Sequence, residues 1–449
     1  MTATIVDEGT RIEGASASLS TSPKTGPVLS TLAPLVCWFG LIGVAAVWGR
    51  HLLDAGVRLG IGAPPLFGRL EWRMSAAAWI SIAFAAAVVA VGPRIAARLG
   101  WVRLVVVGAG LSAAWSRALV FIDHRALFSA TDPSDYLKTA RLIHDPHLFL
   151  TEFVQRIHAY NTHTRGHPPG MEILLWAFAH LGLGGVGWST VLSLAGGAAA
   201  GAAALVALRE IADERSARTA MPFVVLAPAA IWWSSADAFF AGVSAWAVTC
   251  VILATGRNGR RSDALALFGG LLFGIAVFLS YGLVLLALIP VVVAVSRRRL
   301  RPLAVAACGM LPVFIAFGAA GFSWFVGVTA TRHEYLRGAA SRRPYWYFLF
   351  ADLAAFALAI GPAGSVAIAW LRDRRVWLLV GGAIVAIAAA DLSGMSKAEV
   401  ERIWLPFVPW AILATSAFAA GRRERSVRFW LGLQAATAVV IQLAVRSPW

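Results

Sequence analysis

The sequence predicts an all-α, polytopic membrane protein, and three observations lead to this fold class. Hydrophobic residues make up 59% of the 449 residues, while charged residues make up only 14%. The mean hydropathy is +0.72. Apolar windows of about 18 or more residues, long enough for a membrane-spanning helix, recur along the chain. A transmembrane barrel would instead show alternating segments of about 10 residues, a pattern that the sequence does not have.

Four regions follow from the distribution of these windows. Residues 1–28 are rich in Ser, Thr and Gly and lack an apolar segment. We therefore expect a disordered cytoplasmic tail there and no cleavable signal peptide. Residues 29–101 are expected to form a transmembrane hairpin with an outer loop, residues 102–420 a transmembrane core, and residues 421–449 a last transmembrane helix.

Apolar windows and the breaks between them predict about thirteen membrane spans. They lie at about 29–48, 75–93, 102–122, 187–208, 219–236, 238–256, 264–280, 282–297, 303–322, 346–371, 376–392, 403–420 and 427–445. With the N-terminus in the cytoplasm, every cytoplasmic loop carries an arginine cluster, as the positive-inside rule requires. The clusters are Arg94, Arg98 and Arg103; Arg209, Arg215 and Arg218; Arg257, Arg260 and Arg261; Arg297, Arg298, Arg299 and Arg301; Arg372, Arg374 and Arg375; and Arg422, Arg423 and Arg425. This map predicts a protein of the cytoplasmic membrane with residues 123–186 in a large outer loop.

One segment of that loop is apolar enough to be mistaken for a span. Residues 168–183 are short for a crossing helix and contain Glu172 and His180. If they crossed the membrane, every later arginine cluster would face outward. We expect an interfacial or re-entrant helix that begins at the Pro168-Pro169 pair.

The net charge of +16 would suggest a nucleic-acid partner for a soluble protein. Here the basic cytoplasmic loops account for much of the excess, and no nucleic-acid partner is expected. The outer loops nevertheless carry many cations. Two interpretations stay open for them: solvation with contacts to membrane lipids, or recognition of an anionic substrate such as a phosphate.

Neither a metal site nor a nucleotide site has support in the sequence. Seven of the nine histidines fall between His124 and His180, but their spacing is irregular, so a divalent metal is left open without support. Cys37, Cys250 and Cys308 lie in apolar runs, where buried inert thiols are expected. No Walker motif and no G-x-G-x-x-G after a strand is present, so no cofactor is expected.

Short motifs occur in order along the core. Asp132, Tyr136, Ala140 and Arg141 fit D-x-x-x-Y-x-x-x-A-[RK], and His167-Pro168-Pro169 fits [HK]-P-P before an aromatic-rich helix that contains Trp176. Further motifs lie at residues 233–240, 279–282, 343–347 and 401–406. Together they resemble the GT-C superfamily of polyprenyl-phosphate-dependent glycosyltransferases, especially the branch with protein mannosyltransferases and lipid A aminoarabinose transferases.

The resemblance covers about residues 102–420 and has two departures. Tyr281 stands where the family pattern has a lysine, and the hairpin at 29–101 has no counterpart. The resemblance implies a GT-C-like bundle that moves a hexose or pentose from a polyprenyl-phosphate carrier, with inversion, to an extracytoplasmic acceptor. That acceptor would be a glycolipid, an envelope polysaccharide or a protein.

Such a transfer needs a carboxylate as general base and cations for the departing phosphate. The resemblance makes Asp132 the first candidate for the base, with Asp135 next and Asp123 third. An N-cap role for Asp132 before Pro133 stays open. Candidate substrate-binding residues are Tyr136, His163, Arg165, His167, Asp237, Tyr281, Arg342, Arg343 and Arg402. For the arginines, the alternative is a side chain that reaches the lipid headgroups.

Two other classes of function remain as alternatives. A transporter or flippase of lipid-linked sugars would need polar residues deep in several spans, and most predicted spans lack charges at their centres. A non-catalytic membrane scaffold would use the outer loop only to bind a partner.

Overall fold

The computed structural model describes residues 29–123, 133–419 and 424–447, and these residues are almost entirely helical. The first helices are α1 (Leu29–Asp54), α2 (Ala78–Arg98) and α3 (Trp101–Phe121). A chain of short helices follows: α4 (Pro133–Ala140), α5 (Pro146–Glu152), η1 (Ile157–Ala159), α6 (Thr162–Gly166) and α7 (Gly170–His180). Asp123, the third candidate for the base, lies two residues after the end of α3, and Asp132 lies outside the described residues.

The long helices of the core come next. They are α8 (Val186–Ile211), α9 (Glu214–Val225), η2 (Pro228–Trp232), α10 (Ala236–Thr255), α11 (Gly259–Leu279), η3 (Tyr281–Ala287), α12 (Leu288–Ser296) and α13 (Arg301–Ala319). The remaining helices are α14 (Trp324–Arg337), η4 (Ala339–Arg342), α15 (Tyr345–Trp370), α16 (Arg374–Leu392), α17 (Val400–Ile403), η5 (Leu405–Phe407), α18 (Val408–Ala411), η6 (Ile412–Ala419) and α19 (Glu424–Ala444). The two-residue strands β1 (Arg69–Leu70) and β2 (Val445–Arg446) pair antiparallel and join the α1–α2 loop to the C-terminal end.

Ten helices in the described part of the chain are long and apolar enough to cross a membrane, which confirms the all-α class and agrees with a multi-pass membrane protein. Two shorter apolar segments, Tyr281–Ser296 and Leu405–Ala419, accompany them. The predicted span at 219–236 is not one helix, because α9 ends at Val225 and η2 begins at Pro228, whose ring removes a backbone donor. The count of about thirteen spans therefore stays a prediction.

Small residues bring α8 and α10 together in the centre of the bundle. A Cβ on Gly196 would lie 2.3 Å from Phe239 Cα, and one on Gly242 would lie 2.6 Å from Gly196 Cα. Glycine is needed at both positions because the two backbones are in direct contact, as in many membrane helix pairs. This contact fixes the beginning of α10, which carries Asp237.

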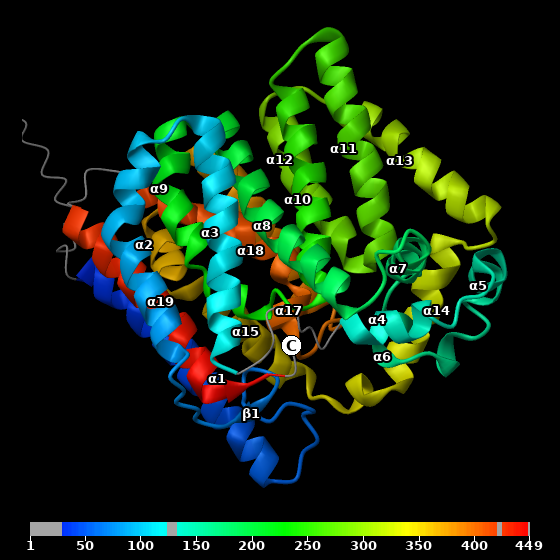
Figure 1. The fold of residues 1–449 in the computed structure, drawn as a ribbon, viewed down its shortest axis with the longest axis horizontal. Helices are drawn as coiled ribbons and strands as arrows, with labels where there is room; N and C mark the ends of the chain where they lie inside the picture. Colours follow the sequence, from blue (N-terminus) through cyan, green and yellow to red (C-terminus); the bar gives the residue numbers. More distant parts are fainter. Residues whose placement is uncertain (1–28, 124–132, 420–423, 448–449) are drawn as a thin grey trace, which may run out of the picture.

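Four of the arginines that were predicted to be cytoplasmic connect neighbouring helix ends. Arg257 and Arg297 both donate to the Glu210 carboxylate, at 2.6 and 3.2 Å, and so join the α10–α11 and α12–α13 turns to α8. Arg218 on α9 donates to the Leu99 carbonyl between α2 and α3 at 2.8 Å, and Arg375 donates to the Ala212 carbonyl after α8 at 3.2 Å. Figure 1 shows α4, α6, α14 and α17 together at the lower end of the bundle.

Candidate active site

A buried arginine lies at the centre of the polar residues around α17. Arg402 is only 3% exposed. Its Nη1 donates to Asp237 Oδ2 at 2.7 Å, while its Nη2 donates to Glu399 Oε2 at 2.7 Å and contacts His163 Nε2 at 3.0 Å. Together with Asp135 beside His163, these residues form what we call the Arg402 cluster. A buried guanidinium of this kind needs such partners, because an unpaired charge away from water is strongly unfavourable.

The members of the cluster come from distant parts of the chain. Asp237 lies in the first turn of α10, and the α8 contact described above sets its position. His163 lies on α6, whose N-cap Asn161 accepts from the Thr164 N–H at 3.0 Å. The same Asn161 side chain donates to the Asp135 carbonyl at 3.0 Å and so holds α6 against α4. The cluster exists only when these helices have packed.

The contacts of His163 define its protonation. A guanidinium can only donate, so His163 Nε2 must accept from Arg402, which leaves the proton of the neutral ring on Nδ1. His163 Nδ1 lies 3.1 Å from Asp135 Oδ2, and the Asp135 carboxylate also accepts from Lys138 Nζ at 3.0 Å. A continuous polar path therefore runs from Asp135 through His163 and Arg402 to Asp237.

Aromatic rings close one side of the cluster. The Tyr136 ring stacks on His163 with a centroid distance of 5.8 Å and meets His167 edge-on, also at 5.8 Å. Phe240 packs against both Tyr136 and His167. Burial lowers the pKa of His167, and its Nδ1 contacts the His163 carbonyl at 2.9 Å. A neutral His167 is therefore expected at pH 7.

The backbone next to Arg402 is held in an unusual conformation. Ala398 and Glu399 have φ of 69° and 62°, which places two successive non-glycine residues in the left-handed region. Each such residue costs about 1–3 kcal/mol and persists only where its surroundings enforce it. Here the Ala398 N–H donates to Asp352 Oδ1 at 3.2 Å. The result is that the Glu399 carboxylate reaches Arg402.

The predicted site residues fall into two groups. Those in or against the Arg402 cluster are Asp135, Tyr136, His163, His167, Asp237 and Arg402, and Arg343 stands beside it with its Nη2 3.8 Å from Glu399 Oε1. Arg165 is 3.8 Å from Glu334, Tyr281 packs edge-on against Trp324, and Arg342 is exposed in η4. These three residues are not members of the Arg402 cluster.

Several buried ionisable residues were not among the predicted site residues. They are Arg117, Glu172, Asp352 and Glu401, and the half-buried Glu399 was missed as well. Arg117, near the end of α3, donates to Ser234 Oγ at 3.1 Å, three residues before Asp237. The signal that could have found Arg117, Glu172 and Asp352 was a charge inside an apolar run, which is functional by default in a membrane helix.

Glu172 gives a pH dependence that can be measured. It is 0% exposed, and burial raises its pKa to about 7. An acid whose pKa is raised on folding contributes stability that is complete below pH 4.5 and is lost as the pH rises through about 7. We expect thermal unfolding in detergent to show a loss on the order of 3 kcal/mol between pH 5 and pH 8. Glu172→Gln should remove that loss.

The control for this prediction is Glu152→Gln. Glu152 lies on α5 in an exposed ion pair with Arg156 and should leave the pH dependence unchanged. Equal pH dependence in the wild type and the Glu172→Gln variant would contradict the prediction.

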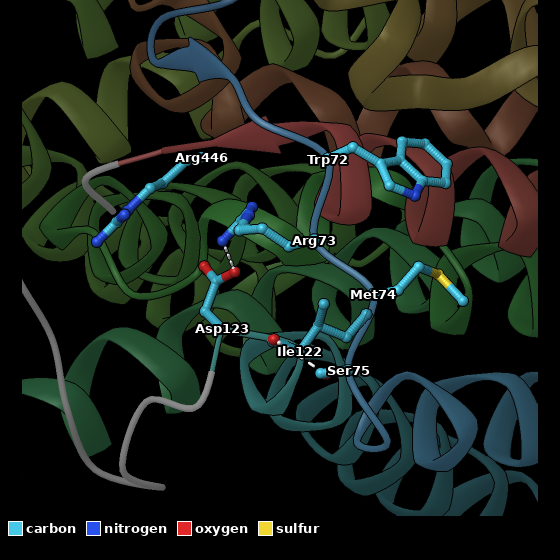
Figure 2. Close-up of a pocket in the computed structure, with 7 residues that line it drawn as sticks. All are labelled: Trp72, Arg73, Met74, Ser75, Ile122, Asp123 and Arg446. Carbon is cyan, nitrogen blue, oxygen red and sulfur yellow. Dashed lines mark hydrogen bonds and ion pairs between the residues drawn. The ribbon is translucent and has the colours of Figure 1, made fainter.

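A cavity lies away from the Arg402 cluster, between the α1–α2 loop and the C-terminal segment. It has a volume of about 430 Å³ and is lined by residues of the α1–α2 loop, the end of α3 and β2. Figure 2 shows Arg73 paired with Asp123 at its wall and Arg446 across from them. Arg73 also donates to the Val445 carbonyl at 2.7 Å, so it holds the α1–α2 loop against the C-terminal segment. Asp123 is thereby placed in an ion pair outside the cluster.

No group of three or more His, Cys, Asp or Glu side chains that could hold a metal ion occurs within residues 29–123, 133–419 and 424–447.

Comparisons with known proteins give two similar structures. No protein-family profile matches the chain, and no curated protein matches it significantly. ArnT from Cupriavidus metallidurans is similar over 63% of this chain and 56% of that protein, with 18% identity and a TM-score of 0.40. The Archaeoglobus fulgidus oligosaccharyltransferase is similar over 75% of this chain and 49% of that protein, with 16% identity and a TM-score of 0.33. The chain thus spans about half the length of the solved proteins it matches.

Proposed function

We propose that this protein is a membrane glycosyltransferase that moves a sugar from a polyprenyl-phosphate carrier to an extracytoplasmic acceptor. The observation that carries the proposal is the Arg402 cluster, where an arginine, a histidine and three carboxylates (Asp135, Asp237 and Glu399) gather around the buried Arg402 side chain. The motif order of the sequence supports the same chemistry. The arginine-rich turns on the other side of the bundle support a site on the outer face of the cytoplasmic membrane.

The reaction requires one carboxylate base and one place for the leaving phosphate. The base takes the proton of an acceptor hydroxyl, and the hydroxyl oxygen bonds to the anomeric carbon while the bond from that carbon to the phosphate oxygen breaks. One displacement inverts the anomeric centre, and polyprenyl phosphate leaves as a monoester. Asp132 is the proposed base, with Asp135 as the alternative.

The cations of the site divide into two roles. Arg402 is already compensated by two carboxylates at 2.7 Å, so it orients Asp237, Glu399 and His163. Arg343 keeps donor capacity, because its Nε has no hydrogen-bond partner among the described residues. Exposed Arg342 is adjacent to it. These two arginines are the proposed ligands of the leaving phosphate, since one guanidinium group can donate two parallel hydrogen bonds to two phosphate oxygens.

The test uses purified protein in detergent with a labelled polyprenyl-phosphate sugar and an extract of envelope acceptors. The wild type should release polyprenyl phosphate and label an acceptor. Asp237→Asn should lower this rate at least tenfold, because a charge-assisted hydrogen bond of about 1.5–3 kcal/mol to Arg402 is weakened.

Asp145→Asn is the matched control. Asp145 caps α5 by accepting from the His147 N–H at 2.8 Å, and asparagine caps a helix equally well. Its rate should equal that of the wild type. Transfer of intact donor between the leaflets of a vesicle, with no loss of its sugar, would instead identify a transporter.

A further inference from the structure

The loop between α1 and α2 packs against the segment that carries Glu399 and Arg402. This loop belongs to the N-terminal hairpin, and β1 and the end of α1 lie at the same end of the bundle as α17 (Figure 1). The helix α1 itself is anchored on α15, where Tyr347 Oη donates to the Ala45 carbonyl at 3.2 Å. Three separate contacts then connect the loop with the Arg402 segment.

The first contact is a hydrogen bond to the residue beside Arg402. The Phe67 backbone N–H donates to Glu401 Oε1 at 3.0 Å. Glu401 is 0% exposed, and its other oxygen has no hydrogen-bond partner among the described residues. Burying a carboxyl group is unfavourable unless its partners are in place, so this bond fixes Glu401 with respect to the loop.

The second contact is apolar. Leu59 and Ile61 are 0% and 4% exposed and share a hydrophobic cluster with Ala398 and Tyr347. Ala398 is the first of the two residues with a left-handed backbone. Such a conformation needs support from its surroundings, and the loop provides part of it.

The third contact is an approach of backbone to a guanidinium group. Gly60 has φ of +70°, and a Cβ at this position would lie 2.9 Å from Arg343 Nη2. The Arg343 side chain also donates to the Lys397 carbonyl. The Arg343 guanidinium therefore packs directly against the backbone of Gly60, where a larger residue would displace it.

We propose that the α1–α2 loop is a positioning element of the active site. It holds Arg343, Ala398 and Glu401, and through them it fixes where Glu399 and Arg402 point. The loop does not touch the reacting atoms in this assignment. The expected effect of the loop on sugar transfer rests on the function proposed above. Its expected effect on the backbone of residues 398–404 does not depend on that function.

The activity test compares Gly60→Ala with Gly56→Ala in the full-length protein. Both glycines have positive φ, +70° and +79°, so alanine causes similar backbone strain at each. Nothing lies within 4 Å of a Cβ on Gly56, whereas the Cβ on Gly60 displaces Arg343. We expect kcat/KM for a labelled polyprenyl-phosphate sugar to fall about tenfold in Gly60→Ala and less than twofold in Gly56→Ala. Their Tm values should agree, and equal kcat/KM values would overturn the proposal.

The second test is independent of activity. Glu401→Leu removes the acceptor of the Phe67 N–H but keeps the volume, while Glu401→Gln keeps a carbonyl oxygen. In the wild type the Arg402, Ile403 and Trp404 amides are bonded to carbonyls of residues 399 and 400. Hydrogen exchange of these amides should become at least tenfold faster in Glu401→Leu and stay within twofold of the wild type in Glu401→Gln.

The two tests separate the two ideas. If the wild type transfers no sugar from any polyprenyl-phosphate donor but Glu401→Leu still exchanges faster than Glu401→Gln, the proposed function fails and the positioning contact stands. If both Glu401 variants exchange like the wild type, the positioning proposal fails, whatever the activity.

Discussion

Replacing Arg402 by leucine is expected to abolish transfer and to destabilise the fold by about 3–5 kcal/mol. The variant leaves the buried Asp237 and the half-buried Glu399 without the cation that both contact at 2.7 Å. Removing one partner of a buried ion pair costs more than the pair contributes, because the remaining charge stays away from water. Thermal or denaturant unfolding in detergent, together with transfer from a labelled donor, measures both effects.

Three further variants show whether the buried charge is the cause. Arg156→Leu removes an exposed arginine paired with Glu152 and should cost at most about 1 kcal/mol. Arg402→Lys keeps the charge but not the forked geometry and should lie between the wild type and Arg402→Leu. The double variant Arg402→Leu with Asp237→Asn should be more stable than Arg402→Leu alone. If it is less stable, lost packing and not the unpaired carboxylate explains the defect.

Part of the candidate site could be predicted from the sequence alone. Asp135, Tyr136, His163 and His167 were all predicted to lie in one polar outer loop, but their contacts arise from the packing of α4 on α6. Asp237 and Arg402 were separate predictions, each at the outer end of a predicted span. Their contact with each other and with His163 depends on the packing of α10, α17 and α6, which local patterns do not encode.

The rest of the site had weaker signals. A left-handed backbone usually coincides with glycine, but Ala398 and Glu399 adopt it because Asp352 and the α1–α2 loop hold them there. In the sequence, nothing distinguishes Glu401 from the other carboxylates of the outer loops. Its contact with the Phe67 N–H is visible only in the structure. Glu172 was recognised only as evidence against a crossing helix, although a carboxylate within an apolar run is a candidate in its own right.

The predicted membrane spans were also only partly correct. Long apolar windows predicted α8 and α10 closely, since hydropathy over about 20 residues is a strong signal. Hydropathy does not register the break between α9 and η2, where Pro222 and Pro228 divide an apolar stretch. Nor does it show that the N-terminal hairpin packs on α15, because lipid-facing and protein-facing apolar surfaces have the same composition in a membrane.

Asp132→Asn is expected to lower the rate of sugar transfer at least about 100-fold, the lower end of what a general base contributes. An amide cannot take the proton of the acceptor hydroxyl, but it has nearly the same size, so membrane insertion and Tm should not change. A single turnover with saturating labelled donor measures the chemical step, and Asp145→Asn again serves as the control.

Asp135→Asn decides between the two candidate bases. The Asp135 carboxylate accepts from Lys138 and lies 3.1 Å from His163 Nδ1, so part of its capacity is already used in holding the Arg402 cluster. We expect a loss of about tenfold for this variant, because the Asp135 carboxylate helps to hold His163 in the Arg402 cluster. If Asp135→Asn instead shows the larger loss and Asp132→Asn retains the normal rate, the base is Asp135. If neither variant affects a wild type that transfers sugar, neither carboxylate is the base.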